Sequence, residues 1–253
     1  MTEAASPAGE MGIFEHLAEL RDRIIKSVLA IAAGAVVAFV LYPQIIDILV
    51  SPYREICRDA TAALQPGQCD GRLIVTDPLE GFRVRMQIAG YGGLVIALPI
   101  VLWQVWRFIT PGLNPNEKRF AVPFVLSSVV LFVMGAAFAL WSFPRALDFL
   151  ARIGGEDITP LYSPGNYLSL ITFMMLAFGI GFEFPIVLIF LQLAGVLPTQ
   201  KLRDWRRPAI IMIVVAAAII TPSGDPFTLL ALSGPMYIFY EVSIIIGRFL
   251  KKS

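Results

Sequence analysis

The feature that most constrains this chain is a long apolar run, LSLITFMMLAFGIGFEFPIVLIFLQL, which extends from Leu168 to Leu193 and contains one carboxylate, Glu183. At about 1.5 Å of rise per helical residue the run is about 39 Å long, more than the roughly 30 Å of hydrocarbon in a bilayer. It can therefore cross a membrane even when tilted, with Glu183 deep inside. Because an ionisable group there costs on the order of 2.5 to 3.5 kcal/mol on insertion scales, Glu183 should face protein or water and have a function.

The residues around Glu183 are typical of a helix that is closely packed and locally weakened. Gly179 and Gly181 allow another helix to approach, and Pro185 removes the amide that would bond the Gly181 carbonyl. Two interpretations follow. Either the carboxylate takes part in function, or it is protonated and bonded to a neighbouring helix for packing alone.

Composition places the whole chain in the membrane class. Of its 253 residues, 57% are hydrophobic and only 15% are charged, which is outside the range of an ordinary soluble domain. The net charge of +1 provides no global basic field for binding nucleic acid. With a single histidine, His16, the chain is unsuited to His-based metal clusters and to Ser/His catalysis, so we expect no metal and no other cofactor.

The amino-terminal region has no basic segment before its first apolar run, so it does not read as a cleavable signal peptide. We expect residues 1–11 to be a disordered tail and residues 12–253 to form a single domain. In the segment GIFEHLAELRDRIIKSVLA, apolar residues recur at helical spacing and charges fill the other face. This pattern predicts an amphipathic helix at the membrane surface that runs directly into the first span.

Hydropathy predicts six membrane-spanning helices, so the fold class is an all-α membrane protein. The expected spans are Ile24–Tyr42, Phe82–Phe108, Phe120–Phe143, Leu168–Leu193, Pro208–Ile220 and Phe227–Gly247. The fifth span and the apolar part of the sixth are only about 20 Å long. They require local bilayer thinning, snorkelling or association with partners, unless they form a short hairpin tucked among longer helices.

Six spans put both ends of the chain on one side, and the positive charges indicate which side that is. Thirteen of the 20 Lys and Arg residues lie at the amino end, in the loops after spans two and four, or in the tail, and seven lie on the opposite side. The positive-inside rule then predicts that both termini are cytoplasmic. The loop that contains Cys57 and Cys69 would face outward, where the two residues could form a disulfide or remain free thiols.

Four motifs are distinctive in sequence as well as in position. They are HLAELRDR (16–23), FITPGLNPNEKR (108–119), FGIGFEFP (178–185), and ITPSGDPFT followed by PMYIFYE (220–228 and 235–241). In order and content they resemble the TatC family, the signal-peptide receptor subunit of the twin-arginine protein translocase. The resemblance covers the chain from about residue 12 to residue 248.

The resemblance implies a concave, glove-like bundle in the cytoplasmic membrane that recognises folded cargo bearing a signal peptide with two adjacent arginines. It also implies partners, namely small single-span TatA-type and TatB-type subunits that join in transport driven by the proton-motive force, together with self-association. The signal-binding carboxylates of the family map to Glu19 and Glu117, and Arg21 and Phe108 belong to the same two motifs. A carboxylate can hold a guanidinium through two parallel hydrogen bonds, which lysine cannot reproduce.

The small free energy of an exposed ion pair limits the affinity that these two carboxylates can provide. Exposed ion pairs are worth roughly 0 to 1 kcal/mol each. We therefore expect the arginines to set specificity and the apolar part of the signal peptide to supply most of the affinity. The competing interpretation is local, with Glu19 paired to Arg23 at i, i+4 and Glu117 paired to a basic neighbour such as Arg119.

The resemblance also implies that Glu183 contacts the transmembrane helix of a partner. Tyr240 and Glu241, expected near the cytoplasmic end of span six, are further candidates for that contact, with structural anchoring as the alternative. Four residues are expected to shape turns and helix ends: Pro111, Pro185, Asp225 and Pro226. Among these, Asp225 is placed to bond the free amides of the helix that follows it.

Two other classes of protein compete with this one. A proton-coupled small-solute secondary transporter would also place Glu beside Gly and Pro within a span. Such transporters usually contain internal repeats, and we find none between residues 12–125 and 126–247. An intramembrane hydrolase needs a nucleophile and a base, or paired acids, within a span, and no predicted span contains them. We therefore expect a protein that is not an enzyme.

Overall fold

The computed structural model describes residues 13–60, 73, 75, 77–109, 121–153, 163–221 and 224–250, and these contain helices and no strands. The helices are α1 (Ile13–Val40), α2 (Tyr42–Ala60), α3 (Glu80–Ile109), α4 (Ala121–Ile153), α5 (Pro164–Phe182), α6 (Phe184–Leu193), α7 (Thr199–Asp204), α8 (Arg206–Ile220) and α9 (Pro226–Leu250). The all-α prediction is therefore confirmed for this part of the chain. The expected tail at residues 1–11 lies outside the described residues.

Five helical segments in the described residues are long and apolar enough to cross a membrane. They are Leu17–Val40, Glu80–Phe108, Val122–Leu150, Pro164–Leu193 and Pro226–Phe249. They match five of the six predicted spans. The remaining predicted span corresponds to α8, whose 15 residues reach only about 22 Å.

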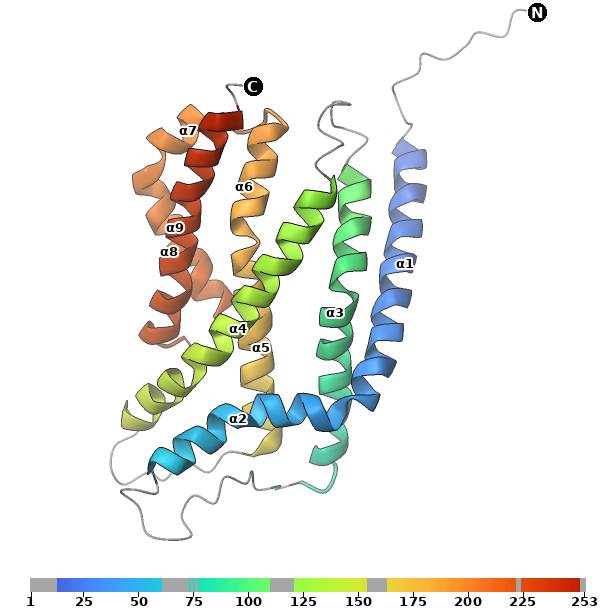
Figure 1. Ribbon diagram of the computed structural model, residues 1–253, viewed down its shortest axis with the longest axis vertical. Helices are drawn as coiled ribbons and strands as arrows, with labels where there is room; N and C mark the ends of the chain where they lie inside the picture. Colours follow the sequence, from blue (N-terminus) through green and yellow to red (C-terminus); the bar gives the residue numbers. More distant parts are fainter. Residues whose placement is uncertain are drawn as a thin grey trace, which may run out of the picture.

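Helices α1 and α3 lie side by side because glycines let their backbones touch (Figure 1). A Cβ atom added to Gly93 would lie 2.5 Å from the backbone nitrogen of Ala35, and one added to Gly34 would lie 2.6 Å from the Gly93 carbonyl oxygen. Such contacts between small residues stabilise helix pairs in lipid, where no hydrophobic effect drives helices together. Most of the remaining α1 surface is apolar and exposed, as expected for a helix that faces lipid.

Helix α4 runs diagonally across the bundle in Figure 1 and crosses α5 at a second pair of glycines. A Cβ on Gly135 would lie 2.5 Å from the Phe178 carbonyl oxygen, and a Cβ on Gly179 would lie 2.6 Å from the Phe132 ring. On the other side of α5, a Cβ on Gly181 would lie 2.8 Å from Leu232 of α9. The close approach expected at Gly179 and Gly181 is thus present, and it fixes α5 between α4 and α9.

The predicted end of span three at Phe143 was wrong, because α4 continues through Pro144 to Ile153. Proline removes one backbone hydrogen bond, which normally ends a helix. Here the flanking side chains Phe143 and Leu147 are almost completely buried in the core, with exposed fractions of 0% and 3%. Their packing sustains the helix across the proline.

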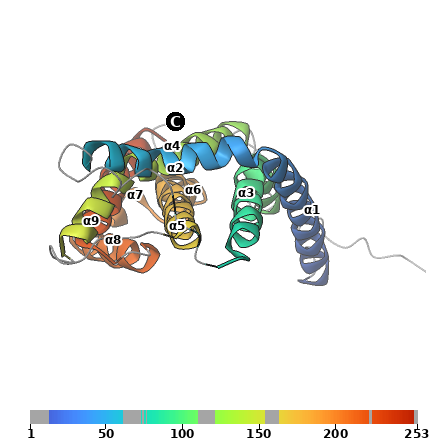
Figure 2. The same ribbon diagram turned by 90° about the horizontal axis from the view of Figure 1, so that it is seen from below.

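The partly apolar stretch between Pro43 and Pro52, to which the sequence analysis assigned no structure, belongs to helix α2. This helix lies along one edge of the molecule, across the ends of α3, α4 and α5 (Figure 2). Pro52 leaves the Ile48 carbonyl without its helical donor, and the Ser51 hydroxyl donates to that carbonyl instead, at 2.7 Å. The spacing of Leu49, Val50 and Tyr53, all buried, is the helical signal that the prolines concealed.

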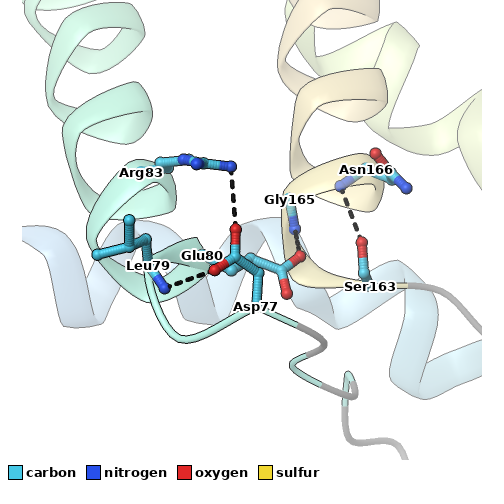
Figure 3. A network of polar contacts seen from close by, with 7 residues as sticks. All are labelled: Asp77, Leu79, Glu80, Arg83, Ser163, Gly165 and Asn166. Carbon is cyan, nitrogen blue, oxygen red and sulfur yellow. Dashed lines mark hydrogen bonds and ion pairs between the residues drawn. The ribbon is translucent and has the colours of Figure 1, made fainter.

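Polar contacts connect the first turns of α3 and α5 and stabilise the residues just before them (Figure 3). The buried Glu80 carboxylate accepts a hydrogen bond from the Gly165 amide at 2.7 Å, which joins the first turns of the two helices. Asp77 accepts from the Leu79 amide at 3.0 Å and forms an ion pair with Arg83 at 3.1 Å. Nearby, the Tyr167 hydroxyl donates to the Leu49 carbonyl at 3.0 Å and so attaches α2 to α5.

We predict that Gly93→Ala lowers the free energy of unfolding by about 1 to 3 kcal/mol, since the new methyl group must push against the α1 backbone. Gly90→Ala on the same helix is the control, because a Cβ there would meet nothing within 4 Å. That variant should be unchanged or slightly stabilised by the better helix propensity of alanine. Denaturant unfolding of both variants in one detergent tests this, and equal stability would contradict the proposed backbone contact.

Candidate functional site

Glu183 lies at a break in the fourth predicted span. Helix α5 ends at Phe182 and α6 begins at Phe184, with Pro185 in the first turn of α6. The Glu183 amide donates to the Ile180 carbonyl at 3.1 Å, while its own carbonyl accepts from the Val187 amide at 3.1 Å. Since Pro185 has no amide hydrogen, the ladder of helical hydrogen bonds is interrupted at this turn.

The Glu183 side chain has unmet hydrogen-bonding capacity. Its Oε1 atom is buried and has no hydrogen-bond partner among the described residues. The polar neighbour of the carboxyl group is Ser128 of α4, a buried residue. A buried polar atom without a partner is costly, so a donor brought to this point from outside would be stabilised.

Glu183 lines an apolar groove of about 530 Å³ that is bounded by α5, α6, α7, α8 and α9. The apolar walls include Val187 of α6, Met212 of α8 and Met236 of α9. Besides Glu183, polar side chains on the lining are Lys201, Trp205 and Tyr240. The groove therefore suits an apolar helix that carries an isolated polar side chain.

Tyr240 and Glu241 of α9 form contacts with α7 and α8, two of the helices that bound this groove. The buried Tyr240 hydroxyl donates to the Leu202 carbonyl at 2.6 Å and so ties α9 to α7. Glu241 forms an ion pair with Arg206 of α8 at 2.6 Å and accepts from the Tyr237 hydroxyl at 3.5 Å. These contacts support the anchoring role that the sequence left open, while Tyr240 also forms part of the groove lining.

Asp225 and Pro226 form the start of α9. The Asp225 Oδ1 atom accepts from the Thr228 amide at 2.8 Å, and its Oδ2 atom accepts from the Thr228 hydroxyl at 2.6 Å. Pro226 is the first residue of the helix, where a missing amide hydrogen costs nothing. The carboxylate therefore caps α9 at the end of the bundle opposite to Tyr240 and Glu241.

A second candidate region lies where α1 begins and α3 ends, at the same end of the bundle (Figure 1). Glu19 forms an ion pair with Arg23, and both side chains are largely covered, with exposed fractions of 26% and 14%. The Glu19 Oε2 atom and the Arg23 Nε atom are buried without hydrogen-bond partners among the described residues. The local pairing considered in the sequence is thus present, but it leaves half of the carboxylate unused.

The other residues predicted for this region are only partly described. Arg21 is 74% exposed and approaches Asp22 at 3.4 Å. Phe108 is half-buried in the last turn of α3. Glu117 and Pro111 lie outside the described residues, as does Cys69.

Aromatic contacts tie the last turns of α3 to α4 and α6. The Trp106 ring stacks on Phe124 with 4.7 Å between centroids and meets Phe190 edge-on at 5.7 Å. Sequence reasoning did not find this packing role of Trp106. It also missed Ser128, for which the signal was a polar residue on the inner face of an apolar helix.

Within the described segments, no three His, Cys, Asp or Glu side chains gather as metal ligands would. The long apolar helices, the broken span and the apolar groove define a multi-helix membrane protein with a carboxylate at membrane depth. Comparison with known proteins gives its family. A family model described as "Sec-independent protein translocase protein (TatC)" matches residues 15–235. The chain belongs to the TatC family, which is a family of translocase components and not of enzymes.

Individual relatives agree with this assignment. The TatC protein of Frankia casuarinae is 41% identical over 94% of this chain, and the chain spans 65% of that relative, slightly less than two thirds. The TatC protein of Carboxydothermus hydrogenoformans is 34% identical over 95% of this chain and 94% of its own length. The crystal structure of a twin-arginine translocase receptor, TatC, has a TM-score of 0.73 at 36% identity, covering 93% of this chain and 99% of the solved chain.

We predict that Tyr240→Phe lowers the free energy of unfolding by about 1 kcal/mol, because the buried Leu202 carbonyl loses its side-chain donor. Tyr91→Phe is the matched control, since the Tyr91 hydroxyl forms no hydrogen bond with the described residues and is only partly buried. Thermal unfolding in detergent compares the two variants. An unchanged midpoint for Tyr240→Phe would show that this hydrogen bond does not anchor α9.

Proposed function

We propose that this chain is the receptor and scaffold subunit of a twin-arginine translocase. It binds twin-arginine signal peptides on folded cargo and recruits small single-span TatA-type and TatB-type subunits, with self-association of the receptor itself. The observation that carries the proposal is the family match over residues 15–235, combined with the apolar groove beside Glu183. The transporter alternative is not favoured, since the relatives are translocase proteins.

The proposed topology has six spans with both termini in the cytoplasm, within the cytoplasmic membrane. Two observations support it. The start of α1 and the end of α9 lie at the same end of the bundle (Figure 1), and the sequence assigns 13 of the 20 Lys and Arg residues to the side of the termini. Helix α8 is the fifth of these six spans, and its shortness is accommodated by local thinning of the bilayer or by a partner helix beside it.

The signal peptide binds at the amino end of α1, where Glu19 receives one of its arginines. The free Oε2 atom of Glu19 offers an acceptor, and the existing partner, Arg23, is four residues away on the same helix. Because i, i+4 ion pairs contribute only about 0.3 to 0.5 kcal/mol, exchange of Arg23 for an incoming guanidinium costs little. Glu117 takes the second arginine, and Arg21 and Phe108 complete the surface.

We predict that Glu19→Ala abolishes crosslinking of a photoreactive twin-arginine peptide to the purified protein, as does Glu117→Ala, because each removes a guanidinium acceptor. Asp22→Ala is the matched control, since Asp22 is a carboxylate in the same turn of α1 that is 61% exposed and lies against Arg21. A twin-lysine peptide should crosslink poorly to the wild type. Normal crosslinking in the Glu19 and Glu117 variants would reject this site.

The partner helix docks in the groove beside Glu183. A polar side chain on that helix donates to the unpartnered Oε1 atom, which offsets part of the cost of burying the carboxylate. The apolar remainder of the partner helix covers the groove walls of α6 and α8. Tyr240 and Glu241 contribute by keeping α7 and α8 in place against α9.

We predict that Glu183→Ala reduces co-purification of single-span subunits from native membranes at least tenfold, because the partner loses its hydrogen-bond acceptor. Ala216→Phe should have a similar effect by filling the groove that Ala216 lines. The control is Ala218→Phe, which adds the same ring to an exposed position of α8 outside the groove lining. Full retention of partners by both Glu183→Ala and Ala216→Phe would contradict docking here, whereas signal-peptide crosslinking should survive both changes.

A further inference from the structure

A second pocket, separate from the Glu183 groove, lies between α7 and the last turns of α9. Its volume is about 680 Å³, and its lining includes Arg203 of α7 and Arg248 of α9. Both arginines are exposed. The pocket thus brings two guanidinium groups together from segments that are 45 positions apart in the sequence.

Neither arginine forms an ion pair with another described residue, and two acids of α7 and α9 have other partners. Asp204 accepts a hydrogen bond from the Gln200 side chain at 3.4 Å. Glu241 is paired with Arg206 at 2.6 Å. The pocket therefore has an uncompensated positive charge that an anion would neutralise.

Two lining residues of this pocket, Thr199 and Gly247, contact Gln192, the residue before the last of α6. The Thr199 hydroxyl donates to Gln192 Oε1 at 3.0 Å, and Gln192 Nε2 donates to the Ser243 carbonyl at 3.1 Å. Gly247 packs so tightly on this side chain that a Cβ atom would overlap Gln192 Oε1. Since α6, α7 and α9 are held together here, the backbone positions that carry the two arginines are fixed relative to each other, which lowers the cost of binding.

The pocket lies at the depth of the membrane interface. The apolar segments Pro164–Leu193 and Pro226–Phe249 both end beside it. Trp205, 47% exposed, follows α7 and has the Lys201 ammonium 5.3 Å from its ring centroid, an arrangement typical of the headgroup region. Ile245 and Phe249, 50% and 72% exposed, place apolar surface next to the arginines.

We propose that this pocket binds the headgroup of an anionic phospholipid. The guanidinium groups of Arg203 and Arg248 hold the phosphate oxygens, for which their planar donor geometry is suited. The acyl chains run along Ile245 and Phe249 toward the hydrocarbon. A zwitterionic lipid binds less well because its own ammonium group repels the two arginines.

The test uses the purified full-length protein and native mass spectrometry with added phosphatidylglycerol or phosphatidylcholine. We expect the wild type to retain phosphatidylglycerol preferentially and the double variant Arg203→Gln/Arg248→Gln to bind it roughly tenfold more weakly, as the loss of two basic groups near anionic lipid implies. The charge-matched control is Arg54→Gln/Arg152→Gln, which removes two arginines that are paired with Asp47 and Asp148 at the other end of the bundle. It should retain wild-type binding.

Any of three lipid-binding results would overturn the proposal. They are equal phosphatidylglycerol binding by the wild type and the Arg203/Arg248 variant, equal binding of the two lipids by the wild type, and an equal loss in the control variant. Inorganic phosphate at the same concentration should not displace the lipid. Displacement would show that the pocket recognises a free anion and would also reject a lipid site.

Discussion

The structure depends on the direct contact of helix backbones at glycine. In hydrocarbon, lipid tails are as apolar as leucine, so helices gain little from hiding apolar side chains and must gain from close packing instead. Gly34 and Gly93 provide that contact between α1 and α3, and Gly135 and Gly179 provide it between α4 and α5. The first pair holds a helix whose remaining surface faces lipid, and the second fixes α5 just before the chain breaks at Glu183.

The break at Glu183 turns a continuous span into two helices with different neighbours. Helix α5 is pressed between α4 and α9, while α6 packs mainly on α9. Apolar residues of α6 and α8 line the groove beside this break, and α8 has only 15 residues. A carboxylate at the turn is thereby left at the edge of an apolar surface, which is the geometry that a helix with one polar group can complement.

The acidic residues of the bundle fall into two groups by how fully they are satisfied. Glu80, Asp225 and Glu241 each bond a second element or cap a helix, and they hold the bundle together. Glu183 and Glu19 each keep a buried oxygen without a partner in the described residues. Because an unsatisfied buried acceptor costs more than a satisfied one, these two positions are the ones where an outside donor gains most.

Sequence by itself determined the helical class, five long spans, the weak turn at Glu183 and the capping residue of α9, because hydropathy, proline and short-range caps act within a few residues. It left α2 unassigned and ended the third span too early, at Phe143, because prolines such as Pro52 and Pro144 disfavour a helix. Burial of Tyr53 and Phe143 against other helices overrides that local signal. The groove beside Glu183 and the pair Arg203 and Arg248 were decided only by tertiary structure. Their parts come from helices far apart in the chain, and no local pattern specifies which helix faces which.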